Sequence, residues 1–383
     1  MDEGRHSAAA GPNPSRFYLI DILRGLASFA VVIWHYQHFF ANDLGVVSPR
    51  VYIDHGPPFL AQLRPFYNNG YLAVDLFFVI SGFIFYRVYS VSVGLGSVGS
   101  TQFIVARLAR LYPLHLVTLL LVLVGQMFAY RSLGHEFIYT VNDSYHFVLN
   151  IFFASSWGFQ SGLSFNGPVW SVSIEILLYA VFFGVARAVG DRRDWDLPAI
   201  GMMLMTAFVV SRVGHKSETV RAISTALVDF FLGGLAYQLW LASTAGQRAR
   251  WLLASAGVLV TTGATLAFAY GVIGRQTFPL LAYPACIVSL AVLQSWRPEA
   301  GRSLRLIGDI TYSVYLIHFP VQLAMVLAIH QWSLSVDFEH AAVLLVFVAL
   351  LIVLAIPVHY GFELPAQRWV KRRLMPVPHS HPP

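Results

Sequence analysis

Long runs of apolar residues follow one another along nearly the whole chain, with short polar segments between them. A helix needs about 20 mostly apolar residues to cross a bilayer, and most of these runs approach that length. The pattern predicts an all-α fold, a polytopic membrane helix bundle with about ten transmembrane helices. The expected spans are residues 17–40, 70–91, 113–130, 167–187, 197–211, 222–242, 251–270, 278–294, 312–331 and 341–361.

Three regions follow from this pattern. Residues 1–16 form a polar N-terminal segment, residues 17–370 the membrane domain, and residues 371–383 a basic, proline-rich tail. The N-terminal segment lacks the short apolar core and cleavage site of a secretory signal peptide, so the first span is expected to be retained. An aromatic segment at residues 146–158 is expected to form a partial or re-entrant helix.

The composition agrees with a membrane protein. Hydrophobic residues make up 57% of the chain and charged residues 11%, whereas soluble domains carry about 25% charged residues. The net charge of +6 comes from arginines in short loops, and this distribution argues against nucleic-acid binding. Most of the 25 lysines and arginines lie at the termini and in the loops after even-numbered spans, which predicts cytoplasmic termini. The single cysteine, Cys286, excludes an internal disulfide and a cysteine metal cluster.

The first span carries two ionisable residues, Arg24 and His35. Eleven steps of about 100° bring them to one helical face, roughly 16 Å apart along the axis. A cation in hydrocarbon costs on the order of 3 kcal/mol, so a shared stripe predicts a polar cavity that both residues line. The alternative is that Arg24 snorkels to the near surface and His35 to the far one.

Two further arginines, Arg107 and Arg110, are three residues apart and share a helical face before the third span. With Arg24 they would place three guanidinium groups near one mouth of the membrane domain. Such a group suits phosphates, because guanidinium forks make charge-assisted hydrogen bonds to them. The alternative is that Arg107 and Arg110 are ordinary cytoplasmic loop arginines.

Several polar residues inside apolar spans need an explanation. A neutral imidazole at His35 could take a proton from a hydroxyl. Asp75 and Glu175 need a partner in hydrocarbon, either His35 or an arginine, although Glu175 could equally form a structural ion pair. Asp309, beside a glycine at the start of the ninth span, is expected to cap a helix. Residues that could line a pocket or pack in the core are Trp34, Trp170, Tyr179, Tyr312, Tyr315 and His318.

Taken in order, six motifs resemble the acyltransferase 3 family of integral membrane acyltransferases, mostly bacterial proteins that O-acetylate glycans or antibiotics. The family's motifs correspond here to Arg24 and His35; Asp75 to Gly82; Arg107, Arg110, Tyr112 and Pro113; Trp170, Ser171 and Glu175; Thr311 to His318; and Glu363 and Pro365. Each motif is weak alone, whereas all six in order are specific.

The resemblance implies transfer of an acyl group, usually acetyl, from cytoplasmic acyl-CoA to a hydroxyl of a carbohydrate-containing acceptor such as an exopolysaccharide, O-antigen or Nod factor. It implies a multi-pass protein of the bacterial inner membrane, acetyl-CoA as co-substrate, and no metal. The residues implied for catalysis are His35, Glu175 and Asp75. Those implied for acetyl-CoA binding are Arg24, Arg107, Arg110 and Tyr112. Those implied for acceptor binding are Trp170, His318 and Tyr315.

Two other functions stay open at this point. Buried charges also mark translocation paths, so the chain could be a transporter or flippase for a glycan intermediate. It could also be a structural subunit that positions a separate enzyme. Some family members carry a C-terminal extracytoplasmic hydrolase-like domain that we do not find here, so any acceptor-handling partner would have to be separate. The oligomeric state is open, with a homo-oligomer among the alternatives.

Overall fold

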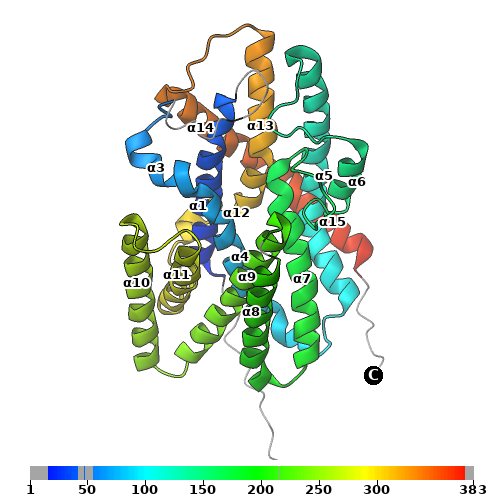
Figure 1. The fold of residues 1–383 in the computed structure, drawn as a ribbon. Coiled ribbons are helices and arrows are strands. Elements are labelled where there is room, and N and C mark those ends of the chain that lie inside the picture. The colour runs from blue at the N-terminus through cyan, green and yellow to red at the C-terminus, as the bar shows by residue number, and fades with distance from the viewer. Residues whose placement is uncertain (1–15, 42–46, 48–54, 215, 376–383) are drawn as a thin grey trace, which may run out of the picture.

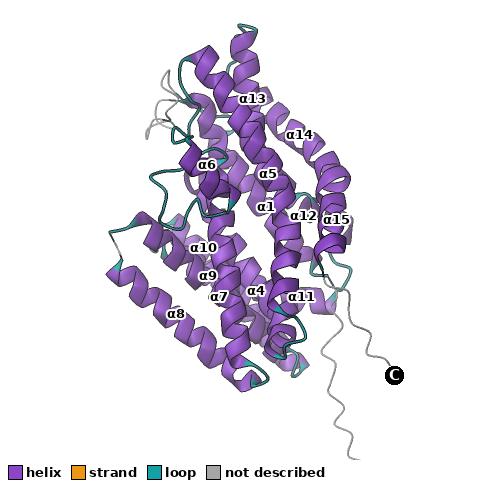
Figure 2. Cartoon of the chain, turned by 90° about the vertical axis from the view of Figure 1, so that its right-hand side faces the viewer, coloured by secondary structure: helices purple, strands orange, loops and turns teal. Residues whose placement is uncertain are grey.

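A computed structural model describes residues 16–41, 47, 55–214 and 216–375. Within these ranges the chain is a bundle of helices, and its only β-type pairing is an isolated bridge between Ala41 and Val47 (Figures 1 and 2). Ten helical segments are long and apolar enough to cross a membrane, which confirms the all-α class and the predicted number of spans. The side on which the termini lie stays a prediction.

The ten segments combine the helices as follows: α1 and η1 (Tyr18–Phe40), α3, η2 and α4 (Leu60–Gly94), α5 (Ser100–Leu133), η3 and α7 (Gly167–Val189), η4 and α8 (Arg193–Val213), α9 (Glu218–Ser243), α10 (Gln247–Ala269), α11 (Thr277–Trp296), α13 (Thr311–Gln331), and α14, η6 and α15 (Ala341–Leu374). Individual helices used below are α1 (Tyr18–His35), α3 (Leu60–Asn69), α4 (Ala73–Gly94), α6 (Ser144–Ile151), α7 (Trp170–Val189), α8 (Asp196–Val213), α12 (Arg305–Asp309), α14 (Ala341–Pro357) and α15 (Leu364–Leu374).

The third span is longer than predicted. Helix α5 begins at Ser100 and continues through Pro113, so a start near Pro113 was wrong. A proline removes one backbone hydrogen bond, but a helix packed along its length tolerates that loss. Arg107 and Arg110 therefore belong to the helix itself and are held rigidly by it.

Two other segments are more helical than the sequence suggested. Residues 60–69, expected as loop, form α3, which leads through η2 (Gly70–Leu72) into α4. The predicted partial helix is confirmed as α6, although it ends at Ile151 and the residues after it turn. The end of this segment contacts α7, where the Trp157 indole N–H donates to the Ser173 carbonyl at 2.9 Å.

The last span continues past its predicted end. After α14 the chain forms a π-helical turn, η6 (Val358–Glu363), and then α15. The basic residues Lys371, Arg372 and Arg373 lie on α15, so the first part of the predicted tail is helical, and the boundary at Lys371 stays a prediction. Residues 1–15 and the tail histidines His379 and His381 lie outside the described residues.

Glycines bring α4 and α9 into backbone contact near the middle of the bundle. A Cβ atom at Gly82 would collide with the Phe230 backbone of α9, and one at Gly233 would collide with the Val79 backbone of α4. Small residues permit this close approach of the two backbones. Inside a bilayer there is no hydrophobic driving force between helices, so van der Waals packing of this kind holds them together. Around this contact the main apolar core joins α1, α4, α7, α9 and α11.

Candidate functional site

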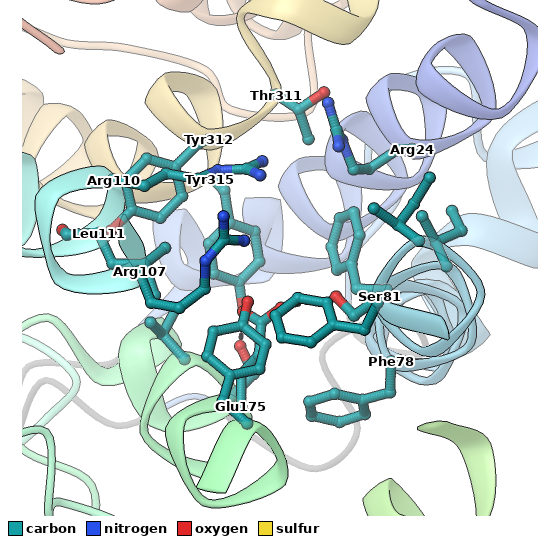
Figure 3. Close-up of a pocket in the computed structure, with 17 residues that line it drawn as sticks. Arg24, Phe78, Ser81, Arg107, Arg110, Leu111, Glu175, Thr311, Tyr312 and Tyr315 are labelled. Atoms are coloured by element: carbon teal, nitrogen blue, oxygen red, sulfur yellow. Dashed lines mark hydrogen bonds between the residues drawn. The ribbon is translucent and has the colours of Figure 1, made fainter. Parts of the chain in front are cut away.

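A polar pocket lies between α1, α4, α5, α7 and α13. Arg24 enters it from α1, and Arg107 and Arg110 enter it from α5 (Figure 3). The space between these side chains, the open mouth of the pocket included, is about 810 Å³. The structure therefore brings together three arginines that are up to 86 residues apart in the sequence.

These arginines are only partly neutralised. Arg24 donates to the Gly308 carbonyl at 3.1 Å and pairs with Asp21 at 3.1 Å. Arg107 donates to the Tyr89 hydroxyl at 2.6 Å. The Nε atoms of Arg24 and Arg107 are buried without a hydrogen-bond partner. Among the described residues, neither Arg107 nor Arg110 forms an ion pair, so the pocket keeps an excess of positive charge that suits an anion.

Glu175 is the carboxylate of this pocket. It accepts a hydrogen bond from the Ser81 hydroxyl at 2.6 Å and interacts electrostatically with Arg24 and Arg110. No cation of the described chain lies within ion-pair distance of it, so it is not half of a tight structural ion pair. Among the described residues, no hydrogen bond or ion pair joins Glu175 to His35, which was expected as its partner in place of an arginine.

A second polar pocket continues from the first toward α15. The two pockets share Arg24, Arg110 and Tyr312, and the second adds Gln367 from α15. The two polar pockets are therefore neighbours, with these three side chains in the lining of both. Asp309 lies on its rim, where it pairs with Arg16 and accepts from the Tyr360 hydroxyl at 3.1 Å. Because α13 has no side-chain cap, the expectation that Asp309 caps a helix was wrong.

Deeper in the bundle, His35 belongs to a cluster of three buried histidines. Its ring lies 4.9 Å from the ring of His38 and 4.8 Å from the ring of His318. The Nδ1 atom of His35 lies 2.9 Å from the Val31 carbonyl oxygen. A carbonyl only accepts hydrogen bonds, so Nδ1 carries the proton and Nε2 keeps the lone pair. A backbone carbonyl thus fixes the tautomer of His35.

His318 is oriented in the same way. Its Nδ1 donates to the Tyr315 carbonyl at 2.6 Å, and its buried Nε2 has no hydrogen-bond partner. Gln322 joins the other two histidines, since it accepts from His38 Nδ1 at 3.2 Å and donates to the His35 carbonyl at 3.0 Å. Within the described chain no cluster of His, Cys, Asp or Glu is arranged to hold a metal. The arrangement is suited to proton transfer.

Tyr315 connects the pocket with the histidine cluster. It lines the pocket, and its ring lies 5.9 Å from the ring of His318. Its hydroxyl bonds to Ser171 at 2.7 Å and to the Pro168 carbonyl at 2.8 Å. Arg24 lines the pocket but His35 does not, so the expectation that one cavity is lined by both differs from the structure. Both Tyr315, which lines the pocket, and His318, whose ring lies beside that of His35, come from α13.

Three predicted site residues lie elsewhere. Tyr112 packs against Phe153, with ring centroids 5.9 Å apart, and Trp170 packs against the main apolar core. Asp75 does not line either polar pocket and interacts electrostatically with Asp229 instead. Whether these residues act in the reaction stays a prediction.

Several polar residues of the site were not assigned a role from the sequence. Ser81 and Thr311 line the pocket, and both belong to motifs that resemble those of the family. His38 and Gln322 complete the histidine cluster. Their positions carried a signal, because His38 follows His35 by one helical turn and Gln322 follows His318 by one.

Known proteins resemble this chain over most of its length. The exopolysaccharide production protein ExoZ of Rhizobium meliloti is 28% identical over 66% of this chain and 76% of its own. The acyltransferase MdmB of Streptomyces mycarofaciens is 27% identical over 78% of this chain and 77% of its own. The putative membrane-bound transacylase BcsY of Komagataeibacter xylinus is 28% identical over 66% of each chain. No solved structure matches.

The family model described as "Acyltransferase domain" matches residues 17–360, which include every span from α1 to α14 and the pocket residues Arg24, Arg107 and Arg110. The chain therefore belongs to the acyltransferase 3 family, as a multi-pass membrane protein.

Proposed function

We propose that this protein transfers an acyl group, acetyl in the first instance, from cytoplasmic acyl-CoA to a hydroxyl of a carbohydrate-containing acceptor. The observation that carries the proposal is the convergence of Arg24, Arg107 and Arg110 on one pocket without full neutralisation by acids. The names of two relatives, an exopolysaccharide production protein and a transacylase, support a glycan acceptor and acyl transfer. We place the protein in a bacterial inner membrane.

Two neighbouring polar pockets suit a long donor with an anionic end. The pockets share Arg24, Arg110 and Tyr312, and in this proposal the donor occupies both, from α15 to Glu175. At the α15 end Lys371 interacts electrostatically with Arg107 and Arg110. In this proposal the arginines and Lys371 bind the phosphates of acyl-CoA, and the thioester points toward Tyr315 and Ser171.

His35 acts as the general base in this proposal. Its Nε2 takes the proton of the acceptor hydroxyl as the oxygen attacks the thioester carbonyl, so a C–O bond forms and the C–S bond breaks. The proton then passes to the departing thiolate. His318 lies beside His35 with a free Nε2 and is placed to receive the acceptor or to pass the proton on. Tyr315 and Trp170 complete the proposed acceptor side, and Glu175 is the proposed acid of the pocket.

The proposal is tested with purified protein in nanodiscs and radiolabelled acetyl-CoA. Wild type should bind and transfer or release acetyl, His35→Ala should bind without turnover, and Arg110→Ala should bind at least tenfold more weakly. Arg131→Ala is the matched control, because Arg131 is an exposed arginine at the other end of α5. If folded wild type binds no acetyl-CoA, the proposal fails and a transporter or scaffold takes its place.

A further inference from the structure

Outside the pocket, three residues near α6 form a hydrogen-bonded chain. The Nδ1 atom of His146 lies 2.8 Å from Oδ1 of Asp143, and the Nε2 atom of His146 lies 3.1 Å from the Ser161 hydroxyl oxygen. A hydroxyl, an imidazole and a carboxylate in this order are the groups of a serine nucleophile centre. The spacing in the sequence does not indicate it, because Ser161 follows His146 by 15 residues in a loop.

The capping of α6 orients this chain. Asp143 is the N-cap residue, and its Oδ1 accepts the backbone N–H of His146 at 2.8 Å as well as the imidazole N–H. These two hydrogen bonds, the backbone one first, hold the pKa of Asp143 below its usual value. The carboxylate therefore stays ionised. It fixes the proton of His146 on Nδ1 and leaves the Nε2 lone pair facing Ser161.

The loop that carries Ser161 is fixed on both sides. The Phe159 carbonyl accepts from the Tyr145 hydroxyl at 3.0 Å, Gln160 donates to the Thr219 hydroxyl at 3.1 Å, and the Ser164 hydroxyl accepts from Asn150 at 2.9 Å. The backbone N–H of Ser161 also donates to His146 Nε2, at 3.2 Å, so this N–H and the Ser161 hydroxyl share the single Nε2 lone pair and the residue is held at the edge of the imidazole. The nucleophile is thus positioned by the fold.

The histidine of this hydrogen-bonded chain is buried, whereas its serine is exposed. The His146 side chain is 4% exposed, whereas Ser161 lies at the surface. Phe159 and Leu163, each two residues away from Ser161, are 60% and 44% exposed. A shielded base, an accessible hydroxyl and apolar neighbours together suit an ester with a small acyl group. The segment lies beside α5 in Figure 1, in the loop that the charge distribution assigns to the outer face.

We propose that Ser161, His146 and Asp143 form a second catalytic centre, which cleaves carboxylic esters. The Ser161 oxygen bonds to the ester carbonyl carbon while its proton moves to His146 Nε2. The bond from that carbon to the alkoxy oxygen breaks, and the proton passes to the departing alcohol. Water then attacks the acyl-serine, giving the carboxylic acid and free Ser161. No oxidant or cofactor is needed, and the centre is independent of acyl-CoA.

A fluorescent fluorophosphonate tests the centre, because it reacts only with an activated serine. Purified wild type in nanodiscs should be labelled at Ser161, as located by peptide mass spectrometry, and Ser161→Ala should lose that label. Ser132→Ala is the control, since Ser132 is an exposed serine whose hydroxyl bonds only to the Phe128 carbonyl. Hydrolysis of p-nitrophenyl acetate should fall in parallel with labelling.

A purely structural network is distinguished by Asp143→Asn. Asparagine caps a helix as well as aspartate does, so this variant should fold like wild type. It lacks the charge that stabilises an imidazolium, so labelling should slow at least tenfold. Labelling at an unchanged rate in folded Asp143→Asn, or no label at Ser161 in wild type, would overturn the inference. Neither result bears on acyl-CoA binding, which is measured separately.

Discussion

The imidazole of His318 lies 4.8 Å from that of His35, and neither ring bonds to a carboxylate of the described residues. Each ring instead donates from Nδ1 to a carbonyl one turn earlier on its own helix, from Val31 and Tyr315. Two imidazoles, each with Nδ1 bonded to a backbone carbonyl, thus lie side by side at the junction of α1 and α13. The two acids for which His35 or an arginine was the expected partner lie elsewhere, since Glu175 lines the pocket and Asp75 interacts electrostatically with Asp229.

If His318 takes part in proton transfer, His318→Asn should lower acyl transfer about 100-fold, because general acid–base groups contribute at least that much. The dissociation constant for acetyl-CoA should not change, since His318 does not line the pocket. Single-turnover transfer and calorimetric binding check this. His330→Asn, an exposed histidine near the end of the same helix, is the control. A matching loss in both variants would contradict the assignment.

Lys371 should matter only for donors that carry phosphates. One charge-assisted contact contributes about 1.5–3 kcal/mol, so Lys371→Ala should weaken acetyl-CoA binding about tenfold or more. Binding of S-acetyl-pantetheine, which has no phosphate, should stay the same. Arg372→Ala provides the control, because Arg372 is exposed on the same helix. Equal weakening of both donors would show that α15 does not reach the phosphates.

The contact between α4 and α9 predicts a stability effect. Gly82→Ala places a methyl group against the Phe230 backbone, and forced overpacking typically costs about 1–3 kcal/mol. The thermal midpoint in detergent should fall. Gly184→Ala on α7 should instead hold or raise it, because no atom lies within 4 Å of the added Cβ and alanine favours a helix. A midpoint for Gly82→Ala at or above that of wild type would refute the packing argument.

The Asp143 cap predicts a dependence on pH. Hydrogen bonds from His146 hold the pKa of Asp143 below its ordinary value, so the ionised carboxylate stabilises the fold above that value and loses this contribution as the pH falls through the folded-state pKa. Asp143→Asn keeps the cap but cannot titrate. The difference in thermal midpoint between wild type and Asp143→Asn should therefore be present at pH values above the ordinary pKa of an aspartate and close as the pH falls below it. A difference that does not vary with pH would exclude this contribution.

The sequence by itself determined the class of the protein. Apolar runs of spanning length give ten membrane helices, because a bilayer requires every backbone polar group to bond within its own helix. The order of the motifs pointed to the family that residues 17–360 match. Arg24, Arg107 and Arg110 could be grouped in advance, since guanidinium groups in or near apolar spans must find a polar space.

Only the tertiary structure decided which residues meet across helices. The partner of His35 could not be read from spacing on α1, because the ring beside it comes from α13 and the group that orients it is a backbone carbonyl, which every residue has. The Ser161–His146–Asp143 chain was equally hidden, since it depends on how one loop folds back over α6. Helical periodicity places residues on the face of one helix, whereas contacts between helices depend on side-chain packing along the whole chain.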